Sequence, residues 1–330
     1  MNKKNKLGEA TFLLVALMLV LGMISLTACG EGSTGTDTET PATESAETPT
    51  ETPAEESTPE QESAPSAADF DDSSPITIVS REDGSGTRGA FIELFGIEEE
   101  GEDGTKKDMT SKEAVIAKQT DVMMTNVAGD KYAIGYISLG SVNEMIKPVG
   151  IDGVEATTDN VKNDTYPIVR PFNIATKGEP SKEAADFIAY ILSADGQAVV
   201  GESYIPVVEG AAAFESGKPK GKIVVAGSSS VTPIMEKLKE AYNAINADLD
   251  IEIQMSDSSA GITAAIDGTC DIAMASRELK DGESDLTPTR IALDGIAVIV
   301  NNDNPTASLS KDQVKGIFTG AVTEWSGIAG

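Results

Sequence analysis

The chain has 330 residues, with 54 acidic and 25 basic side chains, a formal net charge of −29, two cysteines and no histidine. A charge of this sign excludes non-specific nucleic-acid binding, which requires a basic surface facing the phosphates. The absence of histidine excludes Ser-His-Asp and Cys-His catalysis and removes the commonest zinc and copper ligand.

The N-terminal residues 1–28 have the layout of an export signal. Three lysines at positions 3, 4 and 6 precede an apolar run from Phe12 to Met23, and Leu26-Thr27-Ala28 leads to Cys29. A small residue before the cleavage point is typical of such signals, and Cys29 stands where a lipoprotein signal has its acylated cysteine. We therefore expect cleavage before Cys29 and its modification with palmitate. A signal-anchor helix is the alternative, although the run is short for a span of about 20 apolar residues.

An acidic segment of low complexity follows, from residue 29 to residue 75. Residues 30–75 contain thirteen acidic side chains and no basic one, among repeated Thr, Pro, Glu, Ser and Ala. Such a composition cannot bury enough apolar surface to offset the entropy lost on ordering. We expect a disordered tether that holds an acidic globular body, residues 76–330, near a membrane.

From residue 76 onward, strand-like and helix-like segments alternate. Apolar or alternating runs predict strands at 76–79, 133–137, 222–226, 249–255, 271–275 and 293–300. Helical patterns begin near Thr87 and just before Ile234, and others cover 112–118, 181–192, 195–204, 262–267 and 311–318. This alternation predicts an α/β fold with mainly parallel sheets covered by helices. The stretch Glu209–Gly221, which contains Gly, Lys and Pro, is typical of a linker.

Three loops rich in Gly and Ser each connect a predicted strand to a predicted helix: Ser80–Thr87, Gly227–Ser230 and Ser256–Gly261. At such a point, unpaired backbone N–H groups, the positive helix end and hydroxyl donors converge, which favours an anion. Arg81 adds a guanidinium that can make two bonds to a tetrahedral oxyanion, and Asp83 could hold it in place. One such loop is usually only a helix cap, whereas three with an arginine favour an oxyanion site. The chain contains no phosphate loop of the nucleotide-hydrolysing type.

The run Ser80-Arg81-Glu82-Asp83-Gly84-Ser85-Gly86-Thr87-Arg88, with Gly227–Val231 and Asp257–Gly261, resembles the phosphate-binding lipoproteins of phosphate ABC transporters. The resemblance covers nearly all of residues 76–330. It implies a two-lobed periplasmic-binding-protein-like fold of type II, with a cleft that closes on one phosphate and delivers it to a membrane permease. We expect a lipid-anchored monomer on the extracytoplasmic face of the cell membrane, with no enzymatic activity, no cofactor, no metal and no nucleic-acid partner.

The matching motifs imply which residues bind phosphate: Arg81, Ser85, Gly86, Thr87, Ser230, Val231 and Ser258, supported by Asp83, which would orient Arg81, and by Ser229. Well-known members have an Asp after the strand matched by 271–276, and this Asp accepts the proton of hydrogen phosphate. Here Arg277 occupies that position and Glu278 follows it. We expect Arg277 to reach the ligand or its rim, with Glu278 as the alternative acceptor. Selectivity for phosphate over another oxyanion such as sulfate stays open.

The order of the two halves differs from that of the family, because the Arg81 motif precedes the Gly-Ser-Ser-Ser motif. Joining residues 325–330 to residues 74–79 restores the usual order, so the chain resembles a circular permutation in which Glu209–Gly221 bridges the former ends. This predicts a lobe one at 167–298 and a lobe two split between 76–166 and 299–330, with hinges near Tyr166–Pro171 and Val298–Asn301. A truncated or permuted member without transport activity is the alternative.

Overall fold

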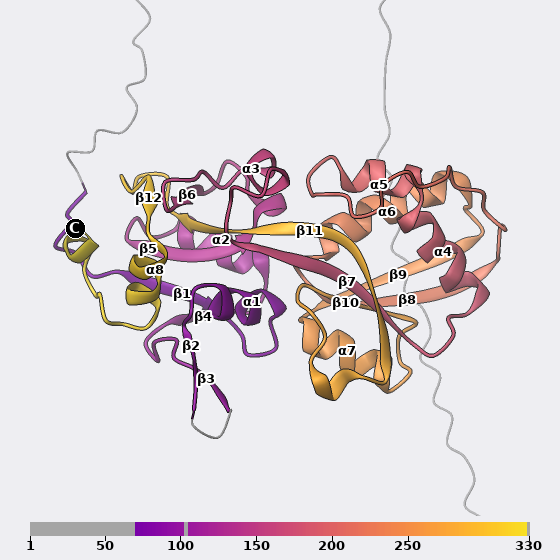
Figure 1. The fold of residues 1–330 in the computed structure, drawn as a ribbon, viewed down its shortest axis with the longest axis horizontal. Helices are drawn as coiled ribbons and strands as arrows, with labels where there is room; N and C mark the ends of the chain where they lie inside the picture. Colours follow the sequence, from indigo (N-terminus) through magenta and orange to yellow (C-terminus); the bar gives the residue numbers. More distant parts are fainter. Residues whose placement is uncertain (1–69, 102–104, 329–330) are drawn as a thin grey trace, which may run out of the picture. The chain divides into compact units, whose positions relative to one another are not determined.

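The computed structural model describes residues 70–101 and 105–328, so the signal segment, Cys29 and most of the predicted tether lie outside the described residues. Ten strands form one mixed sheet in the order β4-β1-β5-β11-β7-β10-β8-β9, with β6 beside β11 and β12 beside β6 (Figure 1). The strands are β1 (Thr77–Arg81), β4 (Val115–Ala117), β5 (Ala133–Ser138), β6 (Lys147–Ile151), β7 (Val169–Lys177), β8 (Gly221–Ser228), β9 (Leu249–Ser256), β10 (Ile272–Ala275), β11 (Leu286–Val300) and β12 (Ser308–Leu309). A separate hairpin consists of β2 (Glu98–Glu100) and β3 (Lys106–Asp108).

Eight α-helices are present among the described residues: α1 (Gly86–Leu94), α2 (Thr120–Ala128), α3 (Thr158–Lys162), α4 (Lys182–Leu192), α5 (Ala194–Val200), α6 (Thr232–Ile245), α7 (Ser258–Ile266) and α8 (Lys311–Phe318). Within the described part of the chain, every helix is too short or too polar to cross a membrane. The α/β fold class is confirmed.

Most predicted elements are confirmed, but the predicted helix at 112–118 is wrong. These residues form a turn followed by β4, which pairs in parallel with β1 through Val79 and Val115 and through Arg81 and Ala117. The run Val115-Ile116-Ala117 contains two β-branched residues, which favour a strand beside an open sheet edge over a helix. The predicted helix at 195–204 is also shorter than expected, because α5 ends at Val200.

The buried side chains form two main cores. The first contains Phe91, stacked on Tyr136 with ring centroids 3.8 Å apart, and the second contains Phe187 and Tyr242 in edge contact. We call residues 70–168 and 296–328 the first half and residues 172–292 the second half. A smaller apolar cluster under α7 belongs to the second half.

Two strands, β7 and β11, run from one half to the other (Figure 1). They pair antiparallel, with an irregularity in register between Arg290 and Ala292. Ile168 belongs to the first core and Phe172, on β7, to the second. The chain therefore passes between the cores within or beside the predicted hinge Tyr166–Pro171. Along β11, Ala292 belongs to the second core and Ile296 to the first, so the strand passes between the cores before the predicted hinge at Val298–Asn301. Its residue Val298 already pairs with β5 and β6 of the first half.

The beginning of the described body lies beside its end. The backbone N–H of Ile76 donates to the carbonyl of Thr323 over 2.8 Å, and Pro75 forms a bridge with Glu324. The expected linker Glu209–Gly221 connects α5 to β8 and packs on the second half, where Phe214 contacts Tyr190 at a centroid distance of 5.2 Å. The circular permutation stays a prediction.

Candidate functional site

The three predicted Gly/Ser loops all end strands of the sheet and lead into helices. Ser85 is the N-cap of α1, and its hydroxyl accepts a hydrogen bond from the N–H of Arg88 over 3.3 Å. Asp257 is the N-cap of α7, and its carboxylate accepts from Ala260 over 2.8 Å. The third loop leads from β8 into α6. Hydroxyl and glycine residues therefore surround three helix N-termini, where orphan N–H groups face outward.

These loops come together across the two halves. The hydroxyl oxygens of Thr87 and Ser230 lie 2.8 Å apart, and the hydroxyl of Thr120 lies 3.3 Å from that of Ser229. A backbone hydrogen bond of 3.2 Å joins the N–H of Ser259 to the carbonyl of Gly84. The hydroxyls of Thr87, Thr120, Ser229, Ser230, Ser258 and Ser276 are all buried; we call these six residues the hydroxyl cluster.

Gly86 allows the close approach of α1 and α7. A side-chain carbon placed on Gly86 would overlap the hydroxyl oxygen of Ser258 and lie 2.8 Å from that of Ser276. A residue larger than glycine would therefore force the two helix starts apart.

Arg81 lies beside the hydroxyl cluster and is 1% exposed. Its Nε and Nη2 each donate to Glu82 over 2.9 Å, and Nη2 also donates to the hydroxyl of Ser229 over 3.1 Å. Among the described residues, its Nη1 has no hydrogen-bond partner. A buried guanidinium nitrogen without an acceptor is costly, so this atom indicates a place for an anionic oxygen.

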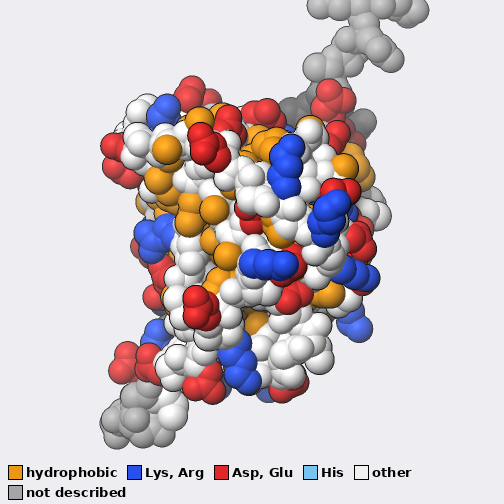
Figure 2. All heavy atoms as spheres, turned by 90° about the vertical axis from the view of Figure 1, so that its right-hand side faces the viewer, with side chains coloured by type: hydrophobic (Ala, Val, Ile, Leu, Met, Phe, Trp, Pro, Cys, Tyr) orange, Lys and Arg blue, Asp and Glu red, His pale blue; other side chains and the backbone are white. Residues whose placement is uncertain are grey.

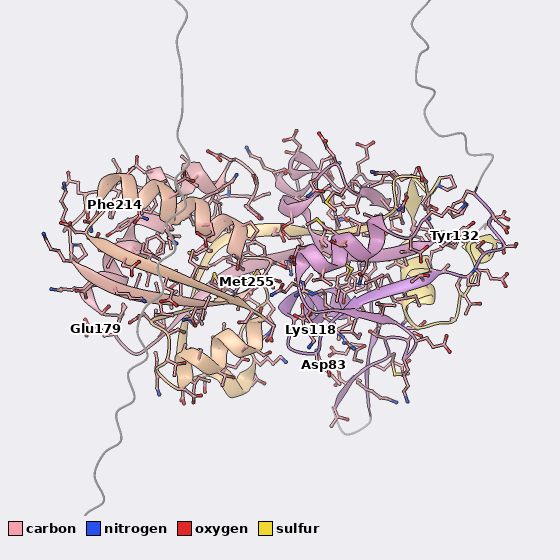
Figure 3. All side chains as sticks on the ribbon, turned by 180° about the vertical axis from the view of Figure 1, so that it is seen from behind. Asp83, Lys118, Tyr132, Glu179, Phe214 and Met255 are labelled. Carbon is pink, nitrogen blue, oxygen red and sulfur yellow. The ribbon has the colours of Figure 1, made fainter. Side chains whose placement is uncertain are left out.

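The prediction that Asp83 orients Arg81 is wrong. The Asp83 carboxylate lies 2.8 Å from Nη1 of Arg88 and its side chain is 97% exposed, whereas Glu82 holds the Arg81 guanidinium with both oxygens. Figure 3 shows Asp83 and Lys118 on one half and Met255 on the other, near the boundary between them. Because the chain leaves β1 after Arg81, the carboxylate of the very next residue can turn back onto the guanidinium.

Arg277 and Glu278 are both engaged by other charged groups. Both terminal nitrogens of Arg277 donate to Glu283 over 2.8 Å, and Nη2 also contacts the hydroxyl of Ser259 at 3.3 Å. Glu278 accepts from Arg290 over 2.6 Å and from Asn173 over 3.1 Å. Arg277 therefore lies next to the start of α7, while Glu278 faces β7 and β11. The contact of either residue with a ligand stays a prediction.

Burial and hydrogen bonding act in opposite directions on Glu283. Desolvation raises the pKa of this carboxyl, but the hydrogen bonds from Arg277 and from the N–H of Lys280 outweigh it, and the net pKa lies below the usual value. The Glu283 carboxylate is consequently ionised at neutral pH.

Four buried residues next to the predicted site are missing from the sequence-based set: Arg170, Asp294, Thr120 and Ser276. Arg170 is 2% exposed, and its Nε and Nη2 donate to Asp294 over 3.1 and 3.0 Å. Its Nη1 donates to the hydroxyl of Thr87 over 2.6 Å. A signal exists for the charged pair, because Arg170 is the one charged residue of 168–176 and Asp294 is the one charged residue of the mainly apolar run 291–300. Facing strands with one charge each favour a buried ion pair.

The arrangement offers many hydrogen-bond donors and few free acceptors. Two carboxylates beside the cluster are held by guanidinium groups, Glu82 by Arg81 and Asp294 by Arg170, and Asp257 caps α7. Burial raises the pKa of Asp294, and the charge and hydrogen bonds of Arg170 oppose this increase. Within the described ranges, no three His, Cys, Asp or Glu residues are grouped so as to hold a metal ion. The site is suited to bind a small oxyanion.

Several known proteins are similar to this chain in sequence or in structure. The sequence profile of the PBP superfamily domain matches residues 64–195 and 212–329. The phosphate-binding protein PstS 2 of Streptococcus agalactiae is 57% identical over 258 residues, which are 77% of this chain and 88% of the relative. The crystal structure of a phosphate-binding protein of a phosphate ABC transporter from Streptococcus pneumoniae is 46% identical, with a TM-score of 0.62, and the match covers 77% of this chain and 100% of that one. The phosphate-binding protein PstS of Staphylococcus saprophyticus is 34% identical over only 123 residues, 34% of this chain and 39% of the relative.

Proposed function

The chain belongs to the PBP superfamily and, within it, to the family of PstS phosphate-binding proteins, and from this premise we propose that it captures inorganic phosphate and delivers it to an ABC permease. The observation that carries this proposal is the buried Arg81, whose Nη1 has no acceptor among the described residues, beside hydroxyls from both halves. We assign the protein a binding role without a catalytic step, in keeping with the names of its relatives.

The proposed ligand set takes donors from each half. Arg81, Ser85, Gly86 and Thr87 would contribute from the first half, and Ser230, Val231 and Ser258 from the second. Because the anion gains contacts to both halves only when they approach, phosphate would shift the population towards the closed state. The second half would move relative to the first about β7 and β11, which makes residues 172–292 the moving lobe.

We further propose that the protein acts outside the cytoplasmic membrane and is held there by lipid on Cys29. This rests on the N-terminal sequence pattern and on the transport role of the relatives. A protein that hands phosphate to a permease gains from staying close to the membrane surface, because tethering raises its local concentration there.

We also propose that the reversed order of the halves is a circular permutation shared with the streptococcal relatives. A match of 258 residues is longer than either half and therefore includes both in this order, whereas the staphylococcal match covers only 34% of this chain. The pairing of Ile76 with Thr323 supports this proposal, because it brings together the two segments that would be continuous in the other order.

A second candidate ligand is sulfate, because Arg277 stands where a proton-accepting carboxylate is expected. Without a free carboxylate, the site lacks a strong acceptor for the proton of hydrogen phosphate, and sulfate, which has no such proton, needs none. Under this alternative the fold and the closure would be the same, and the anion would differ.

Titration calorimetry of the purified chain with phosphate and with sulfate tests the proposed function. Phosphate should bind one to one, and Arg81→Ala should weaken binding at least 100-fold, while Lys220→Ala, which removes an exposed cation just before β8, should leave it unchanged. Equal isotherms for the wild type and Arg81→Ala would overturn the site. Tighter binding of sulfate than of phosphate would favour the second candidate.

A further inference from the structure

We propose that Arg170 is a positioning residue that fixes the hydroxyl of Thr87 as a donor to the bound anion; this rests on the proposed function. Among the residues predicted to bind phosphate, Arg170 donates a hydrogen bond only to Thr87, so it acts through that side chain. The contact is short, 2.6 Å from Nη1 to the hydroxyl oxygen, and both residues are buried.

The chemistry of the two groups sets the direction of this hydrogen bond. A guanidinium can only donate, so the Thr87 oxygen must accept from Arg170, and its single proton remains for another acceptor. The hydroxyl oxygen of Ser230 lies 2.8 Å from that of Thr87, within reach of this proton. A bound oxyanion between the halves would be a stronger acceptor and would take it. A charged donor on the oxygen also polarises the O–H group and strengthens the bond that it gives.

Asp294 keeps Arg170 in this orientation. Its Oδ2 accepts from Nε and Nη2, and its Oδ1 accepts from the hydroxyl of Ser138 over 3.0 Å. With these two nitrogens engaged, the third nitrogen, Nη1, points to Thr87 and to the carbonyl of Ser276 at 3.3 Å.

The Arg170–Asp294 pair lies on the two strands that connect the halves. Arg170 and Asp294 are register partners on β7 and β11, where the chain passes from one core to the other. Thr87 belongs to α1 of the first half, and Ser276 follows β10 of the second. Arg170 therefore links the strands between the halves to a ligand residue in one half and to the backbone of the other.

A double-mutant cycle on phosphate affinity tests the proposal. Thr87→Val removes the hydroxyl and should weaken binding about tenfold, and Arg170→Met should do the same. In the Thr87→Val background, Arg170→Met should cost no more than a further twofold, because its contribution passes through the missing hydroxyl. In the Thr87→Ser background, which keeps the hydroxyl, the tenfold loss should return.

A paired replacement guards against simple misfolding. Arg170→Met leaves Asp294 buried without its partner, so Arg170→Met with Asp294→Leu removes both charges together. This variant should unfold cooperatively and still bind phosphate about tenfold more weakly than the wild type. If the affinity losses of Thr87→Val and Arg170→Met multiplied fully in the double variant, the proposal would be overturned. A general structural effect of Arg170→Met does not depend on the Thr87 hydroxyl. A wild type that binds no phosphate would overturn the proposed function as well.

Discussion

Arg81 combines near-complete burial with an incomplete set of hydrogen bonds, and its carboxylate partner is the residue next to it in the chain. The sequence motif contains Arg81 but does not indicate which carboxylate holds it, since Glu82 and Asp83 are equally plausible in a loop. The difference lies in the local path of the backbone, which turns Asp83 outward to Arg88. The residue types in the motif predict an ion pair between a guanidinium and a carboxylate. Which carboxylate pairs with Arg81 depends on the backbone path, and the sequence does not show that path.

The corrected pairing leads to a matched pair of variants. Glu82→Gln removes the carboxylate that holds Nε and Nη2 of Arg81, and we expect phosphate affinity to fall about fivefold because the guanidinium loses its fixed plane. Asp83→Asn changes an exposed side chain and should alter the affinity by less than twofold. Calorimetry on both variants at one salt concentration makes the comparison. A larger effect of Asp83→Asn would restore the original prediction.

The Arg277–Glu283 pair should make a pH-dependent contribution to stability. The pKa of Glu283 in the folded state lies below its usual value, so its stabilisation is fully present above about pH 4.5 and is lost as the pH falls through the folded-state pKa. Glu283→Gln should therefore lower the free energy of unfolding by about 2 kcal/mol at pH 7 and by less at pH 4. Urea unfolding at both pH values measures this difference, and an equal loss at both would contradict it.

At the level of elements, the loops that begin α1 and α7 are predictable and the strands that join the halves are less so. β7 contains Pro171, which interrupts the expected pattern of a strand, yet Pro171 lies opposite Leu293 in the ladder. The segment before α2 has helical spacing but pairs with β1, because a free sheet edge offers its backbone hydrogen bonds. In both cases the neighbouring strand decides the outcome, and that neighbour is distant in the sequence.

The contact between the starts of α1 and α7 predicts a strong effect of one added methyl group. Gly86→Ala should weaken phosphate binding at least 100-fold, because the methyl group would overlap the hydroxyl of Ser258 and keep the halves from closing. Gly282→Ala is the control, since among the described residues no atom lies within 4 Å of its added carbon. Affinities of the two variants, with their melting temperatures, separate a closure defect from unfolding. Unchanged affinity of Gly86→Ala would show that this contact is not part of the bound state.

For the whole molecule, the sequence predicts the fold class, because strand-like and helix-like segments alternate from residue 76 onward, and it predicts three loops that the structure brings together. It does not predict where β11 passes from one core to the other, which depends on packing between distant residues. The strongly negative total charge does not translate into a uniformly acidic surface. Figure 2 shows acidic, basic and apolar side chains interspersed on the face that it displays. At the proposed site, nearby hydrogen-bond donors outweigh the screened charge of distant carboxylates.

Ligand binding to the closed state should stabilise the whole fold. At a phosphate concentration 100 times its Kd, linkage adds about 2.7 kcal/mol, which corresponds to an increase in Tm of about 5–10 °C for a body of this size. Differential scanning calorimetry with potassium phosphate, and with potassium chloride at equal ionic strength as control, measures the shift. Equal melting temperatures in both salts would contradict phosphate binding.

The two-stranded connection between the halves has a mechanical consequence. Because β7 and β11 hold each other in register on both sides of the irregularity at Arg290, the halves can rotate while the ladder between the strands stays paired. A single-stranded connection would let the halves slide and twist freely, whereas this ribbon confines them to one path. Repeated loading and unloading would then proceed without breaking and remaking backbone pairs, and the donors from the two halves would meet in the same alignment on every cycle.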